Sequence, residues 1–218
     1  MMVACSGTTA PDEGSDTPPY TVSGVFGVEG WTVRGSFSTI RMNHTYISLV
    51  DSSGLPISGA TVRINGFSIP EVDPGTYRDT VNVLYVAGHT YDLEISIDSS
   101  RYLEATITAP EVDSVRPVGI AAGDTLPYDS VAISWQVFGT PSGQLLLIVQ
   151  DTFLELDNDL TSYTLDSSLV LEAIRGRDGT MNLGVAYLNR LDFVELLEES
   201  GYMVGTYFII PIHVDTTR

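Results

Sequence analysis

The sequence predicts an all-β protein made of two consecutive immunoglobulin-like β-sandwiches, with one short helix inserted in the second. Two observations support this prediction: the length of the chain and the period-two alternation of its apolar residues. One sandwich needs about 100 residues, so a chain of 218 residues accommodates two sandwiches and a short tail. Hydrophobic residues make up 43% of the chain, which is enough for each half to bury its own core.

The strands of the first half are predicted from runs of alternating apolar and polar residues, with turn residues between the runs. Apolar and polar side chains alternate over residues 91–97 and again over residues 103–108, as in strands with one buried face. The Asp98-Ser99-Ser100 segment between these runs predicts a hairpin turn. The other strands expected in this half are Tyr20–Val28, Trp31–Ile40, Thr45–Asp51, Ala60–Asn65 and Val81–Val86.

The second half is expected to begin after the proline-containing link at Ala109–Asp113. We therefore predict one domain over residues 20–112 and another over residues 113–218. Trp135 lies on the apolar face of its strand and is expected in the core, whereas Pro211 predicts an edge position or a bulge for the last strand. The strands expected in this half are Val115–Ile120, Val131–Val137, Leu145–Val149, Met181–Leu188 and Met203–Val214.

Two further segments of the second half have patterns of their own. Leu145–Val149 is a continuous apolar run, which is typical of a central strand that is covered on both faces. Asp192 and Glu195 form the Asp-x-x-Glu start of a helix that Gly201 can end. We therefore expect a two-turn helix before the final strand.

The charge of the chain excludes several classes of function. The chain has 28 acidic and 10 basic residues, a formal net charge of −18, and such a field repels nucleic acid. All the basic residues are arginines, so mechanisms that need a lysine as a phosphate ligand, a Schiff base or a general base are excluded. The acidic, lysine-free composition is explained equally well by a saline habitat and by genomic bias.

Cys5 has no cysteine partner for an internal disulfide, and its setting is informative. Val3-Ala4-Cys5-Ser6-Gly7 resembles the processing site of bacterial lipoproteins, in which the cysteine becomes the lipidated first residue. The resemblance implies a lipid anchor in the membrane and a location in the cell envelope or outside the cell. The alternative is a free cysteine, because Met1-Met2 provides neither the basic region nor the apolar run of an export signal.

Residues 6–19 support the anchored arrangement. This segment has one alanine and no other apolar side chain to bury, so it predicts an extended and flexible tether. Such a tether would hold the folded part away from the membrane. No run of about 18 apolar residues follows it, so no spanning segment is expected.

The first half also resembles a known family. Leu55–Ile64, Asp73–Tyr77 and Gly88–Leu93 resemble, in their order, the prealbumin-like, carboxypeptidase-regulatory type of immunoglobulin-like domain, which also occurs in bacterial outer-membrane lipoproteins of unassigned function. The resemblance covers about residues 20–112 and implies a fold far more than a function. It suggests a tight turn at Pro74-Gly75 and a corner anchored by the Tyr91 hydroxyl. Ile133-Ser134-Trp135 in the second half is similar to a fibronectin type III domain.

No local catalytic or cofactor-binding motif occurs in the sequence. His44, His89 and His213 are too far apart for a local zinc motif. His89 is expected to cap a turn or to face solvent, and His213 to lie in the last strand. Neither a Gly-x-Ser-x-Gly elbow nor a phosphate-binding glycine loop is present. We therefore expect no enzyme activity, no catalytic residue and no cofactor.

The densest group of acidic residues is formed by Asp151, Glu155, Asp157 and Asp159. Asp157 and Asp159 are candidate calcium ligands because calcium prefers carboxylate oxygens, but the glycine that an EF-hand loop requires is missing after them. The alternative is a solvated acidic turn. Any pair among 28 acids can look suitable for glycoside hydrolysis, so that count decides nothing.

Trp31 is a candidate platform for a sugar ring because it follows Glu29-Gly30 at an expected turn. Ordinary packing is the alternative. Three functions remain open. The leading one is a non-catalytic, envelope-anchored protein that binds an envelope or surface protein or acts as a spacer. The second is a carbohydrate-binding module of a surface uptake system, with polysaccharide as its partner. The third is a carboxylate- or metal-dependent hydrolase.

Overall fold

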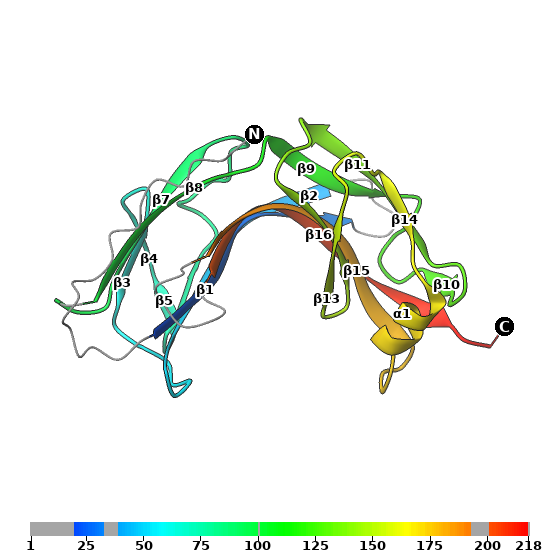
Figure 1. Ribbon diagram of the computed structural model, residues 1–218, viewed down its shortest axis with the longest axis horizontal. Helices are drawn as coiled ribbons and strands as arrows, with labels where there is room; N and C mark the ends of the chain where they lie inside the picture. The colour runs from blue at the N-terminus through cyan, green and yellow to red at the C-terminus, as the bar shows by residue number, and fades with distance from the viewer. Residues whose placement is uncertain (1–19, 33–38, 100, 193–200, 218) are drawn as a thin grey trace. The chain divides into compact units, whose positions relative to one another are not determined.

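The structure, a computed structural model, describes residues 20–32, 39–99, 101–192 and 201–217 (Figure 1). Its regular structure is almost entirely β-strand, and in these ranges there is one helix, α1 (Ser167–Ala173). The expected all-β class with one short helix is therefore confirmed. The described ranges contain no helix that is long and apolar enough to cross a membrane.

The first strands are β1 (Tyr20–Thr32), β2 (Thr39–Asp51), β3 (Thr61–Ile64), β4 (Phe67–Ile69), β5 (Glu71–Asp73), β6 (Thr76–Asp79), β7 (Thr90–Ser96) and β8 (Tyr102–Thr108). The later strands are β9 (Val112–Val118), β10 (Thr125–Pro127), β11 (Ala132–Gly139), β12 (Gln144–Val149), β13 (Thr152–Leu156), β14 (Ser162–Thr164), β15 (Thr180–Asp192) and β16 (Gly201–Asp215).

The chain divides into two compact units. The described part of the first unit comprises residues 20–27, 43–99, 101–109, 189–192 and 201–204. That of the second comprises residues 28–32, 39–42, 110–188 and 205–217. We expected domains over residues 20–112 and 113–218. The division has a boundary at Ala109–Pro110, close to the expected one, but strands β1, β2, β15 and β16 each contribute residues to both units.

The first unit is a sandwich in which two sets of strands share one core. One sheet has the order β4-β3-β7-β8, and the strands of the other follow the order β1-β2-β6-β5. Tyr202 and Val204 of β16 join the same core. Its other buried members are Tyr20, Val22, Ile47, Leu49, Val62, Ile64, Ile69, Tyr77, Val83, Tyr91, Leu93, Ile95, Leu103, Ala105, Ile107 and Ala109.

The hairpin expected between residues 97 and 103 is confirmed. Strands β7 and β8 are antiparallel, with Tyr91 opposite Ile107 and Ser96 opposite Tyr102. At the turn, the Asp98 carboxylate accepts hydrogen bonds from the backbone N–H and the side-chain Nε of Arg101, at 2.9 and 2.7 Å. The alternating pattern therefore placed the buried face of both strands correctly.

The strand expected at Val81–Val86 is wrong, because this segment is irregular. The carboxylate of Asp79 accepts the backbone N–H groups of residues 81, 82 and 83, at 3.2, 2.8 and 3.1 Å. Burial raises the pKa of Asp79, but these hydrogen bonds outweigh it and hold the pKa below its ordinary value. A side chain that occupies these donors removes them from any strand ladder.

The Tyr91 hydroxyl forms hydrogen bonds with backbone groups in the rest of this segment. It donates to the carbonyl of Leu84 at 2.9 Å and accepts from the N–H of Val86 at 2.7 Å. The corner that we expected Tyr91 to anchor is therefore confirmed. His89 is exposed, as expected, and its ring meets that of Tyr91 edge to face at a centroid distance of 5.1 Å.

Glu71 fixes a second turn of the first unit. Its carboxylate accepts the N–H groups of Gly59 at 3.0 Å and Gly75 at 2.8 Å. Hydrogen bonds from the Ser58 hydroxyl and from these two N–H groups lower the pKa of Glu71. Gly75 has a φ of +70°, and a Cβ there would lie 2.6 Å from the Leu49 carbonyl oxygen. The expected tight turn is thus confirmed, and it requires glycine.

The second unit is also a sandwich with one core. One sheet has the order β14-β11-β9, and the strands of the other follow the order β13-β12-β15-β16, with β10 parallel to β16. Val170 and Ile174 anchor α1 to this core. Its other buried members are Val112, Val115, Ile120, Val131, Ile133, Trp135, Leu145, Leu147, Val149, Leu165, Met181, Leu183, Val185, Tyr187, Phe208, Ile210, Ile212 and Val214.

Trp135 is 3% exposed, so its expected place in the core is confirmed. Its indole N–H and the buried hydroxyl of Tyr187 have no hydrogen bond of ordinary geometry. The two groups are nevertheless near neighbours. Burial raises the pKa of Tyr187, and the nearby Trp135 side chain lowers it in part.

The last strand differs from its expected position. Pro211 predicted an edge or a bulge, but β16 lies between β15 and β1 in the strand order. The proline carbonyl accepts from Gly123 at 2.7 Å, in the loop that precedes β10. Regular pairing with β10 begins further along, at His213. Pro211 therefore lies before the regular pairing with β10 begins, where its missing N–H is tolerated.

The helix expected from Asp192 to Gly201 is not tested over residues 193–200, which lie outside the described residues. Its two boundary residues are strand residues: Asp192 ends β15 and Gly201 begins β16. The observed helix, α1, lies earlier in the second unit. Asp166 caps its N-terminus by accepting from the N–H of Ser168 at 2.7 Å.

Candidate functional site

The structure describes only some of the site residues that the sequence predicted. Cys5 lies outside the described residues. Trp31 lies in β1, but its side chain is outside the described part of the structure. Asp157 and Asp159 lie in an exposed turn, in which the carbonyl of Asp157 accepts the N–H of Leu160 at 3.1 Å. These predicted sites remain predictions.

No metal-binding cluster is found in the part of the chain that the structure describes. There, no group of three or more histidine, cysteine, aspartate or glutamate side chains converges. His213 is exposed in β16, and its Nδ1 lies 3.2 Å from the Thr180 hydroxyl. Calcium at Asp157 and Asp159 would therefore need further ligands from water or from backbone carbonyls.

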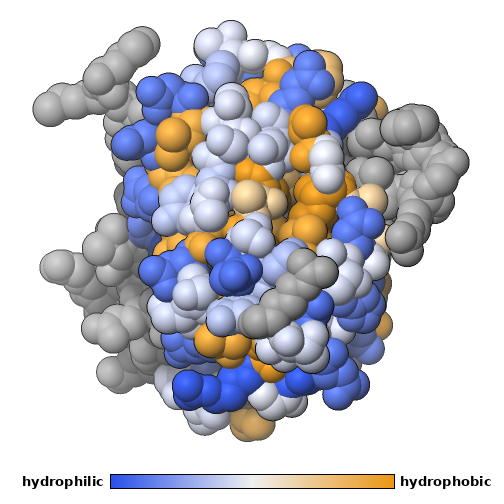
Figure 2. All heavy atoms as spheres, turned by 90° about the vertical axis from the view of Figure 1, so that its right-hand side faces the viewer, coloured by the Kyte–Doolittle hydropathy of each residue, from blue (hydrophilic) through white to orange (hydrophobic). Residues whose placement is uncertain are grey.

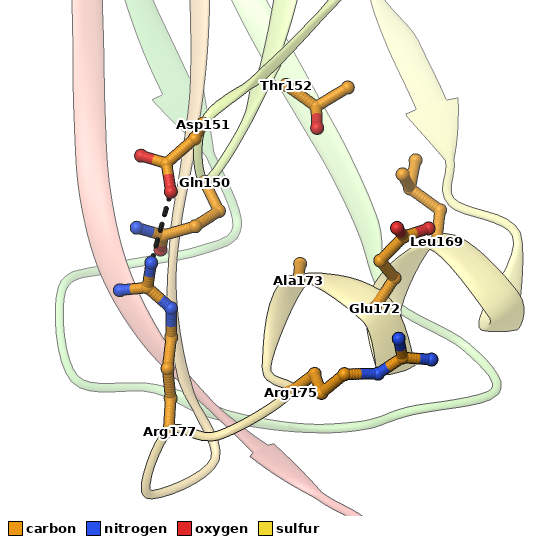
Figure 3. A pocket seen from close by; sticks show the side chains of 8 residues that line it. All are labelled: Gln150, Asp151, Thr152, Leu169, Glu172, Ala173, Arg175 and Arg177. Atoms are coloured by element: carbon orange, nitrogen blue, oxygen red, sulfur yellow. Dashed lines mark hydrogen bonds and ion pairs between the residues drawn. The ribbon is translucent and has the colours of Figure 1, made fainter.

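A small hollow in the second unit brings polar side chains together. It has a volume of about 170 Å³ and lies between the β12–β13 turn and α1 with the loop that follows it. Figure 3 shows Asp151 and Arg177 on one side of the hollow and Glu172 and Arg175 on the other. The lining residues are Gln150, Asp151, Thr152, Leu169, Glu172, Ala173, Arg175 and Arg177.

The β12–β13 turn has an unusual backbone. Gln150 has a φ of +56°, in the left-handed region that non-glycine residues seldom occupy. It is held by Asn182 of β15: the Gln150 N–H donates to the Asn182 carbonyl at 2.7 Å, and the Gln150 Oε1 accepts from the Asn182 N–H at 3.0 Å. The tight turn projects Asp151 and Thr152 towards the hollow. Strained turns of this kind are often found at binding sites.

The opposite wall follows from the two faces of α1. Val170 and Ile174 are buried in the core, so Glu172 and Ala173 lie on the side of the helix that lines the hollow. The chain then turns through Arg175-Gly176-Arg177, where the N–H of Arg177 donates to the Ile174 carbonyl at 3.0 Å. Two of the ten arginines of the protein are thus placed at one small site.

The charges of the hollow balance. An Arg177 Nη atom lies 3.1 Å from an oxygen of Asp151, and this exposed ion pair stands on one side of the hollow. Arg175 and Glu172 are also exposed. The hollow therefore offers two guanidinium groups as donors, two carboxylates as acceptors, and an amide and a hydroxyl that can do both. It can bind a ligand that has many hydrogen-bonding groups and needs no net charge.

Sequence reasoning missed this site except for Asp151, which it included in the acidic cluster. A signal for α1 was present, because Asp166 is a good cap and Leu169, Val170, Ala173 and Ile174 have helical spacing before a glycine. The approach of the helix to the β12–β13 turn depends on long-range packing. No sequence signal could have shown it.

Comparisons with known proteins do not identify a family. No protein-family model matches the chain, and no curated protein matches it. The chain is similar to the Ig1-2 module of the Drosophila receptor protein tyrosine phosphatase DLAR, at 10% identity and a TM-score of 0.36, over 92% of this chain and 97% of that one.

Two other similar structures have lower TM-scores. The fibronectin-III array of RIM-binding protein is 12% identical with a TM-score of 0.27, over 94% of this chain and 72% of that one. SGBP-B of the Bacteroides ovatus mixed-linkage glucan utilization locus, solved with a heptasaccharide, is 10% identical with a TM-score of 0.23, over 94% of this chain and 62% of that one. Likeness of this size shows neither a family nor a function.

Proposed function

We propose that the chain is a non-catalytic binding protein of the cell envelope, and that the hollow beside α1 is its recognition site. The observation that carries this proposal is the convergence of six polar side chains from two separate segments, residues 150–152 and 172–177, on one hollow. A concave surface on which polar groups converge is the usual starting point for a binding-site hypothesis. The β-sandwich core beneath them provides a rigid support.

The chemistry of the hollow favours carbohydrate as the ligand. A sugar hydroxyl donates and accepts, so it can bond at the same time to an arginine and to a carboxylate. Leu169 and Ala173 offer an apolar surface to the C–H groups of a sugar ring. The volume of about 170 Å³ is below the ~300–1,000 Å³ of sites that enclose a drug-sized ligand. The site therefore suits one sugar residue of a longer polysaccharide.

Calorimetric titration with a panel of neutral and acidic soluble polysaccharides tests this ligand class. We expect binding that Arg177→Ala and Glu172→Gln each weaken by about tenfold or more, since a hydrogen bond to a charged group contributes roughly 1.5–3 kcal/mol. Arg63→Ala is the matched control. Arg63 is an exposed arginine of the first unit that pairs with Glu94 at 3.8 Å, so its removal should leave binding unchanged.

Two outcomes contradict the carbohydrate proposal. If no polysaccharide of the panel binds, the ligand class is wrong, and an envelope protein becomes the leading partner. If a polysaccharide binds but all three variants bind equally well, the hollow is not the site. Trp31→Ala then tests the stacking platform that the sequence suggested.

The location in the envelope is supported by the setting of Cys5 and by the polar segment that follows it. Expression of the native gene in its own host, with a labelled fatty acid in the medium, tests the anchor. We expect the label on the wild-type protein and its loss in Cys5→Ser, together with release of the protein from the membrane fraction. An unlabelled wild-type protein would leave Cys5 as a free cysteine.

A hydrolase is the remaining alternative. Glycoside hydrolysis needs one carboxyl group to donate a proton while a second carboxylate acts as nucleophile or base. Asp151 and Glu172 both line the hollow, but Asp151 is already engaged by Arg177. Incubation with the bound polysaccharide, with and without added calcium, should release no new reducing ends. Release that Glu172→Gln abolishes would replace the binding function with catalysis.

A further inference from the structure

A protein can recognise a partner through its side chains or through the backbone of a sheet edge. The face seen in Figure 2 has the ordinary mixture of side chains, in which hydrophilic residues surround separate apolar groups. The sheet edges are more distinctive, because one of them is long and regular.

This edge belongs to β8 of the first unit. β8 ends the strand order β4-β3-β7-β8, beside β7 (Figure 1), and no described strand pairs with its other side. Its seven residues pair with β7 without a bulge. Edge strands are commonly protected by shortness, a bulge, proline or charged side chains. β8 has none of the first three, and Glu104 is its one charged residue.

The other edge strands of the described sheets are shorter or interrupted. β4, β5, β10 and β14 have three residues each, and β13 has five. β9 also has seven residues, but it contains Pro117, and its pairing with β11 shifts register between Phe138 and Gly139. β8 is therefore the longest described edge without proline or a bulge.

The pairing pattern shows which backbone groups of β8 face away from β7. The N–H of Ala109 donates to the His89 carbonyl at 2.8 Å, and hydrogen-bonded pairs alternate with non-bonded pairs along an antiparallel ladder. The groups that face outwards therefore belong to Tyr102, Glu104, Thr106 and Thr108. The Thr108 carbonyl accepts from Nδ2 of Asn189 at 2.6 Å, which closes one end. We call the outward groups of the other three residues the open edge.

The side chains of this sheet select the charge of a strand that would pair with the open edge. Arg63 of β3 lies opposite Glu94 of β7, which lies opposite Glu104. Arg63 pairs with Glu94 at 3.8 Å, whereas Glu104 forms no ion pair with any described residue. Like charges directly opposite each other destabilise a sheet. A basic residue on a further strand, opposite Glu104, would compensate the second glutamate.

The residues between the outward positions add an apolar requirement. Leu103, Ala105 and Ile107 are buried members of the first core. Alternate side chains of a further strand would lie beside them, at the edge of the sandwich. Valine and isoleucine suit such half-buried strand positions.

We propose that the open edge binds an extended segment of a partner protein in which a basic residue stands between β-branched apolar residues. The segment adds an antiparallel strand to the sheet, held by backbone hydrogen bonds, and its basic residue pairs with Glu104. This residue cannot come from β8 of a second copy, which contains no basic residue. The net charge of −18 attracts a basic segment and repels an acidic one.

Amide hydrogen exchange of the full chain, followed by NMR, tests the proposal with the end-blocked peptide Thr-Val-Arg-Val-Thr. Saturating peptide should slow exchange at Tyr102, Glu104 and Thr106 by about tenfold or more, because new hydrogen bonds protect their N–H groups. The N–H groups of Leu103 and Ala105 already face β7 and should change less. Peptide that binds elsewhere would not produce this alternation.

N-methylated peptides test the backbone pairing. In the expected register, the arginine and the two threonines turn their N–H groups towards β8. Methylation of these three nitrogens should abolish the protection, whereas methylation of the two valine nitrogens should preserve it. Equal effects of the two methylated peptides would overturn strand addition.

Charge reversal tests the partner chemistry. Glu104→Arg should weaken the arginine peptide by about fivefold or more and favour a peptide with glutamate in its place. Glu155→Arg is the matched control, because it makes the same change on β13 of the second unit and should leave binding unchanged. Circular dichroism shows whether both variants are folded. The proposal is wrong if millimolar arginine peptide protects no outward N–H group, if wild type binds both peptides equally, or if both variants lose binding alike.

Discussion

The outer faces of the larger sheets carry different side chains in the two units of this protein. In the first unit, the outward positions of β1, β2 and β6 include Thr21, Ser23, Tyr46, Ser48 and Arg78, which are partly or fully exposed. In the second unit, the equivalent positions of β12 and β15 include Leu146, Ile148, Ala186 and Leu188, of which the last three are buried. The outward side chains of the first unit are therefore polar and in contact with water, whereas those of the second are apolar and mostly buried.

The polar groups of the two units differ as well. In the first unit, buried polar atoms complete the fold: the Tyr91 hydroxyl bonds to two backbone groups, and the Tyr77 hydroxyl accepts from the N–H of Ala60 at 2.8 Å. Both units also bury polar atoms without such partners: the hydroxyls of Thr45 and Tyr202 in the first, and the indole N–H of Trp135 and the hydroxyl of Tyr187 in the second. The units therefore differ in the tyrosine hydroxyls that bond to backbone groups in the loops of the first unit.

Cutting the chain after Val112 should produce the largest difference in folding between the two units. A fragment of residues 1–112 lacks Tyr202 and Val204, which are buried in the first core, and Leu191, which packs against it. We expect this fragment to be unfolded. A fragment of residues 113–218 keeps every buried member of the second core except Val112, so it should retain more structure. Amide proton dispersion in NMR spectra measures both, and a well-dispersed spectrum of the first fragment would contradict the prediction.

Asp79→Ala should be the most damaging single substitution at the loops of the first unit. It leaves three backbone N–H groups without their acceptor, and we expect a loss of about 2–4 kcal/mol in the free energy of unfolding. Urea unfolding measures this loss. Asp92→Ala is the control, because exposed Asp92 accepts a side-chain hydrogen bond from Thr106 and its removal should cost less than ~0.5 kcal/mol. Equal losses would show that the Asp79 contacts do not hold the loop.

As the pH falls, the first unit should lose stability before the second. Hydrogen bonds lower the folded-state pKa of Asp51, Glu71 and Asp79 in the first unit, and of Asp166 in the second. A lowered folded pKa gives stability that is complete above the ordinary values, 3.8 for Asp and 4.5 for Glu, and is lost as the pH falls through the folded pKa. Amide hydrogen exchange, corrected for intrinsic rates, should therefore show β7 losing protection before β12 below about pH 4.5. Simultaneous loss would show that the units unfold as one.

Removal of one tyrosine hydroxyl should give the smallest effects, and they should differ between the units. Tyr91→Phe leaves the Leu84 carbonyl and the Val86 N–H without their partner, so we expect a loss of about 1–2 kcal/mol. Tyr187→Phe removes a buried hydroxyl that has no ordinary hydrogen bond, so stability should stay within ~0.5 kcal/mol or rise. Thermal unfolding compares the two variants, and a greater loss in Tyr187→Phe would reverse the comparison.

The sequence predicted strands well where the backbone groups were free to pair. The alternating run from Tyr91 matches β7, because its side chains alternate and its backbone joins a regular ladder. The run from Val81 has a similar pattern, and Val83 is indeed buried. It is not a strand, because Asp79 and Tyr91 occupy its backbone groups. Side-chain competition of this kind depends on a turn and on a residue further along the chain, which local periodicity does not include.

The same limit explains the candidate site. Asp151 was recognised as one acid among several, and nothing in its neighbourhood marked Arg177, 26 residues later, as its partner. The continuous apolar run at Leu145–Val149 was more informative, since it predicted a strand covered on both faces. The core covers one face. On the other face Ile148 is buried and Leu146 is partly buried, as the prediction expected.

The chain crosses several times from one unit to the other, and this limits how the protein can change in evolution. The chain passes from one unit to the other after residues 27, 42, 109, 188 and 204. Ordinary sandwich domains are joined by single linkers, so a gene can duplicate, lose or exchange them one at a time. Here no single recombination point separates the two units. Insertions in surface loops remain available for variation, whereas the pair of units must be inherited together.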